Sequence, residues 1–159
     1  MPSGRSGRGR PDGVDPPIPP LGKRGADLLG QVPLFEGLSR RHLRRLAEHA
    51  DEISFREGET IVEEDQPGGS FFVIVEGEVK VRQGGRAIAT AGPGEFFGEI
   101  SLLDGGPRSA TVVADTPVVA IRLFKSSFDR VVKEEPQVAG KILTVVARRL
   151  REAERTISS

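Results

Sequence analysis

The sequence has 159 residues, a formal net charge of zero with 29% charged residues, and no cysteine. Its length gives room for one domain and a tail, and the lack of cysteine excludes disulfides, thiolate metal sites and cysteine nucleophiles. The balanced charge argues against a dedicated nucleic-acid binder. No apolar run approaches the roughly 20 residues that span a bilayer, and the N-terminus has no apolar core typical of a secretory signal. These features fit a cytoplasmic protein.

Residues 1–25 are expected to form a disordered tail rich in Arg, Gly and Pro, because half of the twelve prolines lie in the first twenty positions. Such a segment cannot bury enough apolar surface to offset the entropy lost on ordering. Its arginines Arg5, Arg8 and Arg10 are spaced by Gly and Ser and diluted by two aspartates. A solvated linker is therefore favoured over contact with nucleic acid or an acidic partner.

Residues 26–50 predict a helix in two pieces, with the break just before Pro33. Ser39 is a good N-cap for the second piece, and Leu38 with Leu43 has the spacing of a hydrophobic staple. The domain proper is therefore expected to cover residues 26–159.

One face of the second helix is crowded with arginines, at Arg40, Arg41, Arg44 and Arg45. A solvated surface is favoured there over a phosphate-binding face. The two histidines of the sequence, His42 and His49, are also expected at the surface, because two histidines without clustered carboxylates make a poor metal site. No metal site is expected, which also argues against a metal-dependent cupin.

Between residues 51 and 123, short apolar runs alternate with turn signals rich in Gly and Pro. This rhythm predicts an antiparallel roll, sandwich or barrel, although strict alternation is clear in only some runs. The predicted strands are Ile53–Phe55, Thr60–Val62, Phe71–Val75, Val79–Val81, Ala87–Thr90, Ala110–Ala114 and Val118–Leu123.

Two helices are predicted after the strands, over residues 125–133 and 136–157, and Pro136 is acceptable at a first helical position. The second is long and amphipathic. Its apolar stripe consists of Val138, Ile142, Val145, Val146, Leu150, Ala153 and Ile157. An ordinary packing helix and one half of a dimer seam are both consistent with this stripe.

The stretch Gly92–Thr111 carries the most specific signal for a binding site. The turn at Gly98 lets backbone approach a ligand, and the short helix expected after it begins with free N–H groups that favour an anion. Arg108 offers a planar fork of donors that matches a phosphate, and Glu99 suits sugar hydroxyls because a carboxylate only accepts. The stretch predicts a site for a small phosphorylated sugar. A hairpin loop with a surface Arg and a surface Glu is the alternative.

The segments Phe97–Leu103 and Pro107–Val112 resemble the phosphate-binding cassette of cyclic nucleotide-binding domains, the family of catabolite activator proteins and cyclic AMP-dependent protein kinase regulatory subunits. Leu34–Ser39, Gly58–Val62 and Phe71–Val81 are similar to further parts of these domains, so that the resemblance covers roughly residues 31–157. It implies a mainly β fold: an antiparallel, jelly-roll-like β-roll (a double-stranded β-helix) with N-terminal helices and a C-terminal lid helix.

The sequence departs from the family at Asp65-Gln66, where members often have glycine followed by an acidic residue. We expect a modest local cost, because aspartate tolerates a left-handed turn position.

The resemblance implies a 3′,5′-cyclic nucleotide as ligand. Arg108 would bind the exocyclic phosphate oxygens, Glu99 would accept from the ribose 2′-hydroxyl, and backbone N–H groups of the two cassette turns would add neutral donors. The expected ligand-binding residues are Phe97, Gly98, Glu99, Ile100, Ser101, Arg108, Ser109 and Ala110. The residues expected to cap the base are Val146, Arg149 and Leu150.

Cyclic AMP is expected rather than cyclic GMP, because Ser109 follows the cassette arginine as a serine does in the catabolite activator protein. In the C-terminal helix, however, Ala153 and Glu154 stand where that protein has a base-contacting Thr-Ser pair. Its particular adenine contacts are therefore missing here, and the apolar cap or an arginine stacked on the base would replace them.

The function expected is that of a stand-alone cyclic nucleotide-binding regulatory module that signals by closure of its C-terminal helix. It would act on a protein effector or by self-association through that helix, with no membrane or nucleic-acid partner. No cofactor, catalytic residue or enzymatic activity is expected. The alternatives are a nucleotide-free β-roll for protein–protein interaction or oligomerisation and a DNA-binding regulator that uses the arginine tail.

Overall fold

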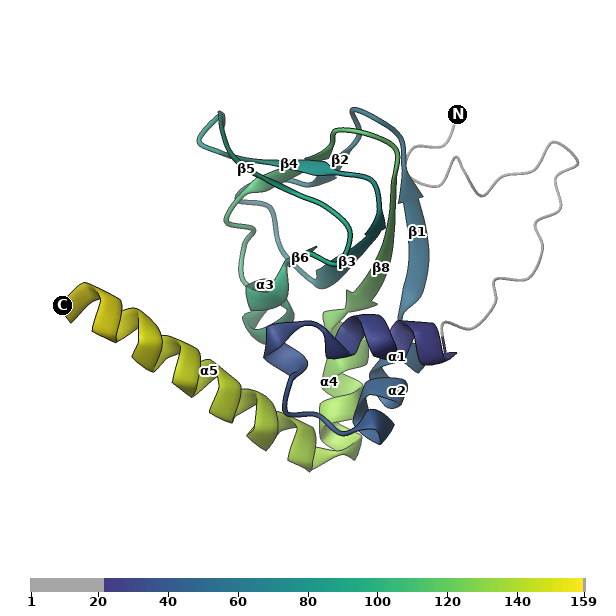
Figure 1. The fold of residues 1–159 in the computed structure, drawn as a ribbon, viewed down its shortest axis with the longest axis vertical. Helices are drawn as coiled ribbons and strands as arrows, with labels where there is room; N and C mark the ends of the chain where they lie inside the picture. Colours follow the sequence, from purple (N-terminus) through teal and green to yellow (C-terminus); the bar gives the residue numbers. More distant parts are fainter. Residues whose placement is uncertain (1–21, 159) are drawn as a thin grey trace, which may run out of the picture.

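The structure, a computed structural model, describes residues 22–158 and contains two four-stranded antiparallel sheets in that range (Figure 1). In spatial order the first sheet is β1 (Asp51–Phe55), β8 (Val118–Phe124), β3 (Ser70–Glu76) and β6 (Phe96–Phe97). The second is β2 (Thr60–Val62), β7 (Thr111–Ala114), β4 (Val79–Gln83) and β5 (Arg86–Ala91). These sheets, with helices on either side in the chain, confirm the predicted β-roll. The two-residue strand β6 was not predicted.

The helices gather at one end of the roll, where α1, α2 and α4 lie together and α5 runs outward past α3 (Figure 1). They are α1 (Gly22–Gly30), the 3₁₀ element η2 (Pro33–Phe35), α2 (Arg40–Glu48), α3 (Glu99–Asp104), α4 (Lys125–Glu134) and α5 (Pro136–Ser158). The two C-terminal helices were predicted within one residue at each end.

The N-terminal segment differs from the prediction in two ways. The region expected as two helical pieces contains three, because η2 separates α1 from α2 and buries Leu34 and Phe35. In addition, α1 begins at Gly22, inside the stretch expected as a tail, whose residues 1–21 lie outside the described range. Ala26 and Leu29 are fully buried, and their burial favours a helix that starts one turn before Ala26.

Strand β3 has a buried side chain at four successive positions because it lies between two apolar cores. Phe71 and Val73 belong to the core that the helices share with the roll, whereas Phe72 and Ile74 belong to the core between the two sheets. Side chains alternate between the two faces of a strand, so a strand buried on both faces shows no polar alternation. This explains why apolar and polar residues do not alternate clearly in this part of the sequence.

The start of α2 forms as predicted, since Ser39 accepts a hydrogen bond of 3.2 Å from the backbone N–H of His42. The prediction of a surface position for His42 was wrong, because its side chain is buried and the residue is 2% exposed. His42 lies one turn before Leu46, on the face of α2 that is buried, and its Nε2 is 3.6 Å from Oε1 of Glu135, the residue between α4 and α5.

Ion pairs occupy most of the arginine face of α2. Arg40 pairs with Asp27, Arg41 pairs with Glu135 at 2.7 Å, and Arg45 contacts carboxylates on α2 and α4. These contacts join the face to neighbouring helices.

Asp65 is, among the described residues, the one non-glycine position with positive φ, at 69°. A side chain in this left-handed region costs roughly 1 kcal/mol, and glycine avoids the cost. We expect Asp65→Gly to raise the free energy of unfolding by up to about 1 kcal/mol and Asp65→Ala to lower it. Equilibrium urea denaturation measures both, and a less stable Asp65→Gly variant would show that Asp65 contributes a contact that offsets the backbone cost.

Candidate functional site

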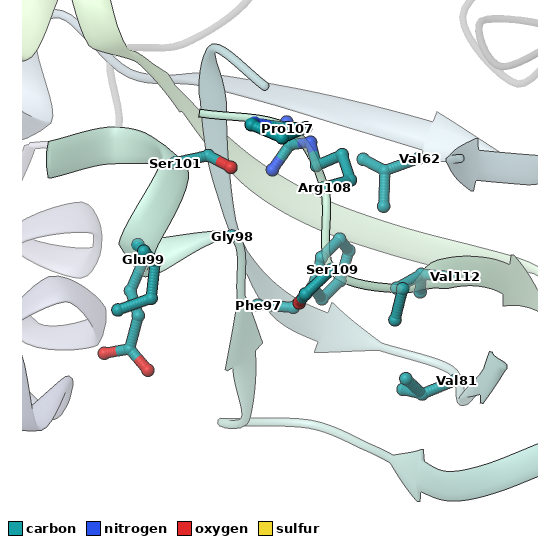
Figure 2. A pocket seen from close by; sticks show the side chains of 12 residues that line it. Val62, Val81, Phe97, Gly98, Glu99, Ser101, Pro107, Arg108, Ser109 and Val112 are labelled. Atoms are coloured by element: carbon teal, nitrogen blue, oxygen red, sulfur yellow. The ribbon is translucent and has the colours of Figure 1, made fainter. Parts of the chain in front are cut away.

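All eight residues expected to bind the ligand line one cavity of about 270 Å³ (Figure 2). This volume is close to the lower end of the range for small-molecule pockets, roughly 300 Å³. Four further residues, which were not predicted from the sequence, also line the cavity: Val62, Val81, Pro107 and Val112. The cavity lies between β6, the start of α3 and the second sheet.

The three valines form one row across the second sheet. Val112 of β7 is paired in register with Val62 of β2 and with Val81 of β4. Their side chains make an apolar wall suited to the face of a sugar or a base. The sequence shows the three apolar positions, but their place in one row depends on strand register, which the sequence leaves open.

Gly98 joins β6 to α3 and has a φ of 90°, in the left-handed region. A Cβ atom at this position would lie 2.6 Å from Nη1 of Arg108 and 2.7 Å from the carbonyl oxygen of Ser70. The turn therefore requires glycine for both its conformation and its space. It brings the free backbone N–H groups at the start of α3 next to the guanidinium.

Ser101 is buried on α3, where its hydroxyl donates to the carbonyl of Gly106 at 3.1 Å. That bond closes the turn after α3. Ser101 thus lines the cavity and also holds the segment that leads to Arg108.

The backbone of Arg108 is held by the β2–β3 loop, which is far from it in the sequence. The Arg108 N–H donates to the carbonyl of Gln66 at 2.9 Å, and the Asp65 N–H donates to the carbonyl of Arg108 at 2.9 Å. Gly68 adds a bond to Gly106 at 3.1 Å. The place where the sequence departs from the family pattern is therefore in direct contact with the cassette.

The side chain of Arg108 is a buried cation, and the residue is 7% exposed. Its Nη2 donates to the hydroxyl of Ser70 at 2.9 Å, whereas its Nη1 is buried and has no hydrogen-bond partner in the structure. Burial lowers the pKa of the Arg108 guanidinium. A buried charge without a counter-charge is costly, so this site favours an anion.

Glu99 lines the same cavity but directs its carboxylate away from Arg108 (Figure 2). Its Oε2 accepts a hydrogen bond of 2.9 Å from Nη1 of Arg149 on α5. That hydrogen bond and the attraction between the two charges raise the pKa of Arg149. The negative charge of Glu99 is therefore balanced by α5, which leaves the charge of Arg108 available.

The residues expected as a base cap lie beside the first cavity. Val146, Arg149 and Leu150 line a second cavity of about 290 Å³ between α5, α3 and η2. Glu99 and Ile100 line both cavities. The structure thus brings α5 into contact with the cassette, and the capping of a base by these three residues stays a prediction.

Two features of residues 22–158 concern other kinds of site. No three His, Asp or Glu side chains in that range are grouped so that they could hold a metal ion. Nor does any helix there combine the length and apolar character needed to cross a membrane.

Comparison with known proteins identifies relatives over most of the chain. The model of the cyclic nucleotide-binding domain family matches residues 52–135, more than half of the chain. The cyclic AMP receptor protein of Thermus thermophilus is 34% identical over 127 residues, which are 77% of this chain and 59% of that protein. The CRP-like cAMP-activated global transcriptional regulator of Mycobacterium tuberculosis is 29% identical over 132 residues, or 79% of this chain and 58% of that protein.

A solved structure from Streptomyces coelicolor, the N-terminal domain of a transcriptional regulator, superimposes with a TM-score of 0.74 at 35% identity. The match covers 80% of this chain and 94% of that domain. The chain spans less than three-fifths of the length of the two curated relatives. The family match, the roll and the cassette agree, and the chain belongs to the cyclic nucleotide-binding domain family.

Proposed function

We propose that this chain is a regulatory module that binds cyclic AMP in the cavity beside Arg108. The observation that carries the proposal is the buried guanidinium of Arg108, with Nη1 unpartnered in the structure and adjacent to the cavity. A cyclic phosphodiester has one negative charge and two exocyclic oxygens, which match one arginine fork. The names of the two curated relatives favour cyclic AMP over cyclic GMP.

The other walls of the cavity have roles consistent with this ligand. Backbone N–H groups at the start of α3 and at Ser109–Ala110 would add neutral donors to the phosphate. The row of Val62, Val112 and Val81 would contact the apolar face of the ribose or the base. Since the two relatives are named as a transcriptional regulator and a cyclic AMP receptor, we propose regulation rather than catalysis for this chain, and no residue is assigned a catalytic role.

We further propose that the nucleotide acts on α5 through Glu99. This carboxylate has one oxygen bonded to Arg149 and stands at the wall shared by the two cavities. A ribose hydroxyl that donates to Glu99 would compete with Arg149 or share the carboxylate with it, because a carboxylate accepts about four hydrogen bonds. Either event changes the free energy of the arrangement in which α5 contacts α3, and a ligand shifts an equilibrium by its difference in affinity for the two states.

The exposed face of α5 supports self-association as the output. Leu143 and Leu150 are 68% and 61% exposed, and they lie seven residues apart with Val146 between them. This is the spacing of a helix–helix seam, and large exposed apolar side chains favour a contact surface. We propose a second copy of the chain as the partner, because a single helical stripe pairs readily with its own symmetry mate.

Calorimetric titration with cyclic AMP and cyclic GMP tests the ligand assignment. We expect cyclic AMP to bind more tightly and Arg108→Ala to weaken it by roughly 100-fold, because removing one partner of a buried charge pair costs about 2–5 kcal/mol. Arg86→Ala, which removes an exposed arginine from β5, is the matched control and should bind normally. Equal affinity of wild type and Arg108→Ala would refute the assignment. No binding of either nucleotide by wild type would favour the alternative of a nucleotide-free interaction module.

Amide hydrogen exchange along α5, measured with and without cyclic AMP, tests the link through Glu99. In wild type we expect the nucleotide to change exchange near Arg149, because it alters the partner of that side chain. Arg149→Ala should remove most of this change while retaining affinity within roughly tenfold, about the effect of one surface-accessible ion pair. Arg151→Ala on the same helix is the control. A wild-type response in Arg149→Ala would exclude the ion pair as the connection.

Sedimentation velocity tests self-association. We expect wild type to form dimers and the double variant Leu143→Glu/Leu150→Glu to be monomeric, since two carboxylates in the stripe oppose its burial. Ile88→Glu changes an exposed apolar residue of β5 and should leave the dimer intact. A monomeric wild type, or a dimer that survives the double variant, would refute the α5 seam.

A further inference from the structure

Arg108 has a side-chain partner that the sequence did not indicate, the hydroxyl of Ser70. Ser70 is the first residue of β3, and its Oγ accepts from Nη2 of Arg108 at 2.9 Å. A guanidinium is planar and its five N–H groups have fixed directions. Fixing Nη2 therefore also fixes the direction of Nη1, the buried donor without a partner in the structure.

The backbone around Ser70 is held firmly in place. Its register partner across the sheet is Phe124 of β8, and the preceding residue, Gly69, accepts a bond of 2.8 Å from the Lys125 N–H. The Ser70 carbonyl lies directly against the Gly98 turn, at 2.7 Å from where a Cβ of Gly98 would stand. Ser70 thus contacts both the turn and the arginine from a strand that is buried on both faces.

The chemistry of this partner matters, because a hydroxyl is neutral. No carboxylate of the described residues forms an ion pair with Arg108, whereas Arg41 of α2 and Arg148 and Arg149 of α5 each pair with a glutamate. A carboxylate at position 70 would orient the guanidinium and also neutralise it. A serine orients it and leaves its charge for an incoming anion.

We propose that Ser70 is a positioning residue, which orients the Arg108 guanidinium toward the cavity without neutralising it. The consequence for affinity rests on the proposed function, the binding of a cyclic phosphate. The orientation of the Arg108 side chain does not rest on the proposed function, since it exists in the protein without any ligand.

Nitrogen-15 NMR of the arginine side chains tests the orientation in the ligand-free protein. The Arg108 signals are assigned by their loss in Arg108→Lys. In wild type we expect the Nη groups of Arg108 to give separate, slowly exchanging signals, because one is hydrogen-bonded inside the protein. Ser70→Ala should average them, and Ser70→Thr, which keeps the hydroxyl, should restore them. Separate signals in Ser70→Ala would overturn the proposal.

Titration with cyclic AMP tests the effect on binding. We expect Ser70→Ala to bind about tenfold more weakly, the loss expected for one hydrogen bond to a charged group. Ser70→Thr should bind within about threefold of wild type, a difference of less than 1 kcal/mol. Ser70→Asp should bind at least as weakly as Ser70→Ala, because its carboxylate competes with the phosphate. Ser54→Ala, on β1 of the same sheet, is the control for loss of a serine hydroxyl.

The outcomes separate the two proposals. Normal affinity in Ser70→Ala, with a wild type that binds, overturns the role of Ser70 and leaves the proposed function intact. Tight binding of cyclic AMP by Ser70→Asp overturns the argument that the side chain at position 70 must be neutral. If wild type binds no cyclic nucleotide, the proposed function fails, and the NMR signals of Ser70→Ala still decide whether Ser70 orients Arg108. Thermal unfolding by circular dichroism confirms that each variant is folded.

Discussion

The site depends on one buried positive charge, the guanidinium of Arg108. Keeping a cation out of water without a carboxylate beside it is costly, and the surrounding fold must hold it there. Three separate parts of the chain do so: the β2–β3 loop bonds its backbone, the Gly98 turn packs against its Nη1, and β3 supplies the Ser70 hydroxyl. The loop and Ser70 adjoin each other in the sequence but are far from Gly98 and Arg108, and the roll brings them together with the cassette.

Two arginines from different elements, Arg108 and Arg149, supply the positive charge at the cassette. A bound phosphate and the nearby carboxylate of Glu99 would repel each other, and both would compete for the positive charge of Arg108. The structure removes that conflict, because Arg149 of α5 balances Glu99 from the other side. The carboxylate that would face a sugar in the proposed function is thereby also one contact between the roll and its last helix. In the proposed function, Glu99 would connect the ligand with the position of α5 through its hydrogen bond to Arg149.

Local signals in the sequence predicted most elements, and the family resemblance named the cassette residues of the cavity except Pro107 and Val112. The Gly and Pro turns separated the strands, Ser39 marked the start of α2, and helical spacing gave α4 and α5. The errors arose where tertiary contacts determine whether a residue is buried or forms a strand. His42 is buried because α2 turns that face toward Glu135, and β6 is too short to have a periodicity. The valine row and Ser70 depend on which strands are neighbours, and one sequence does not contain that information.

Strand β3 lies between two apolar cores and contributes side chains to both. Phe71 and Val73 fill the core that the helices share with the roll, and Phe72 and Ile74 fill the core between the two sheets. Displacing this strand would disturb the packing of both cores, so we expect the two cores to unfold as one cooperative unit rather than as two foldons. Because both faces of the strand are buried, we expect substitutions on either face to lower the free energy of unfolding. The packing of this strand on both faces and its pairing with β8 also hold its first residue, Ser70, in place.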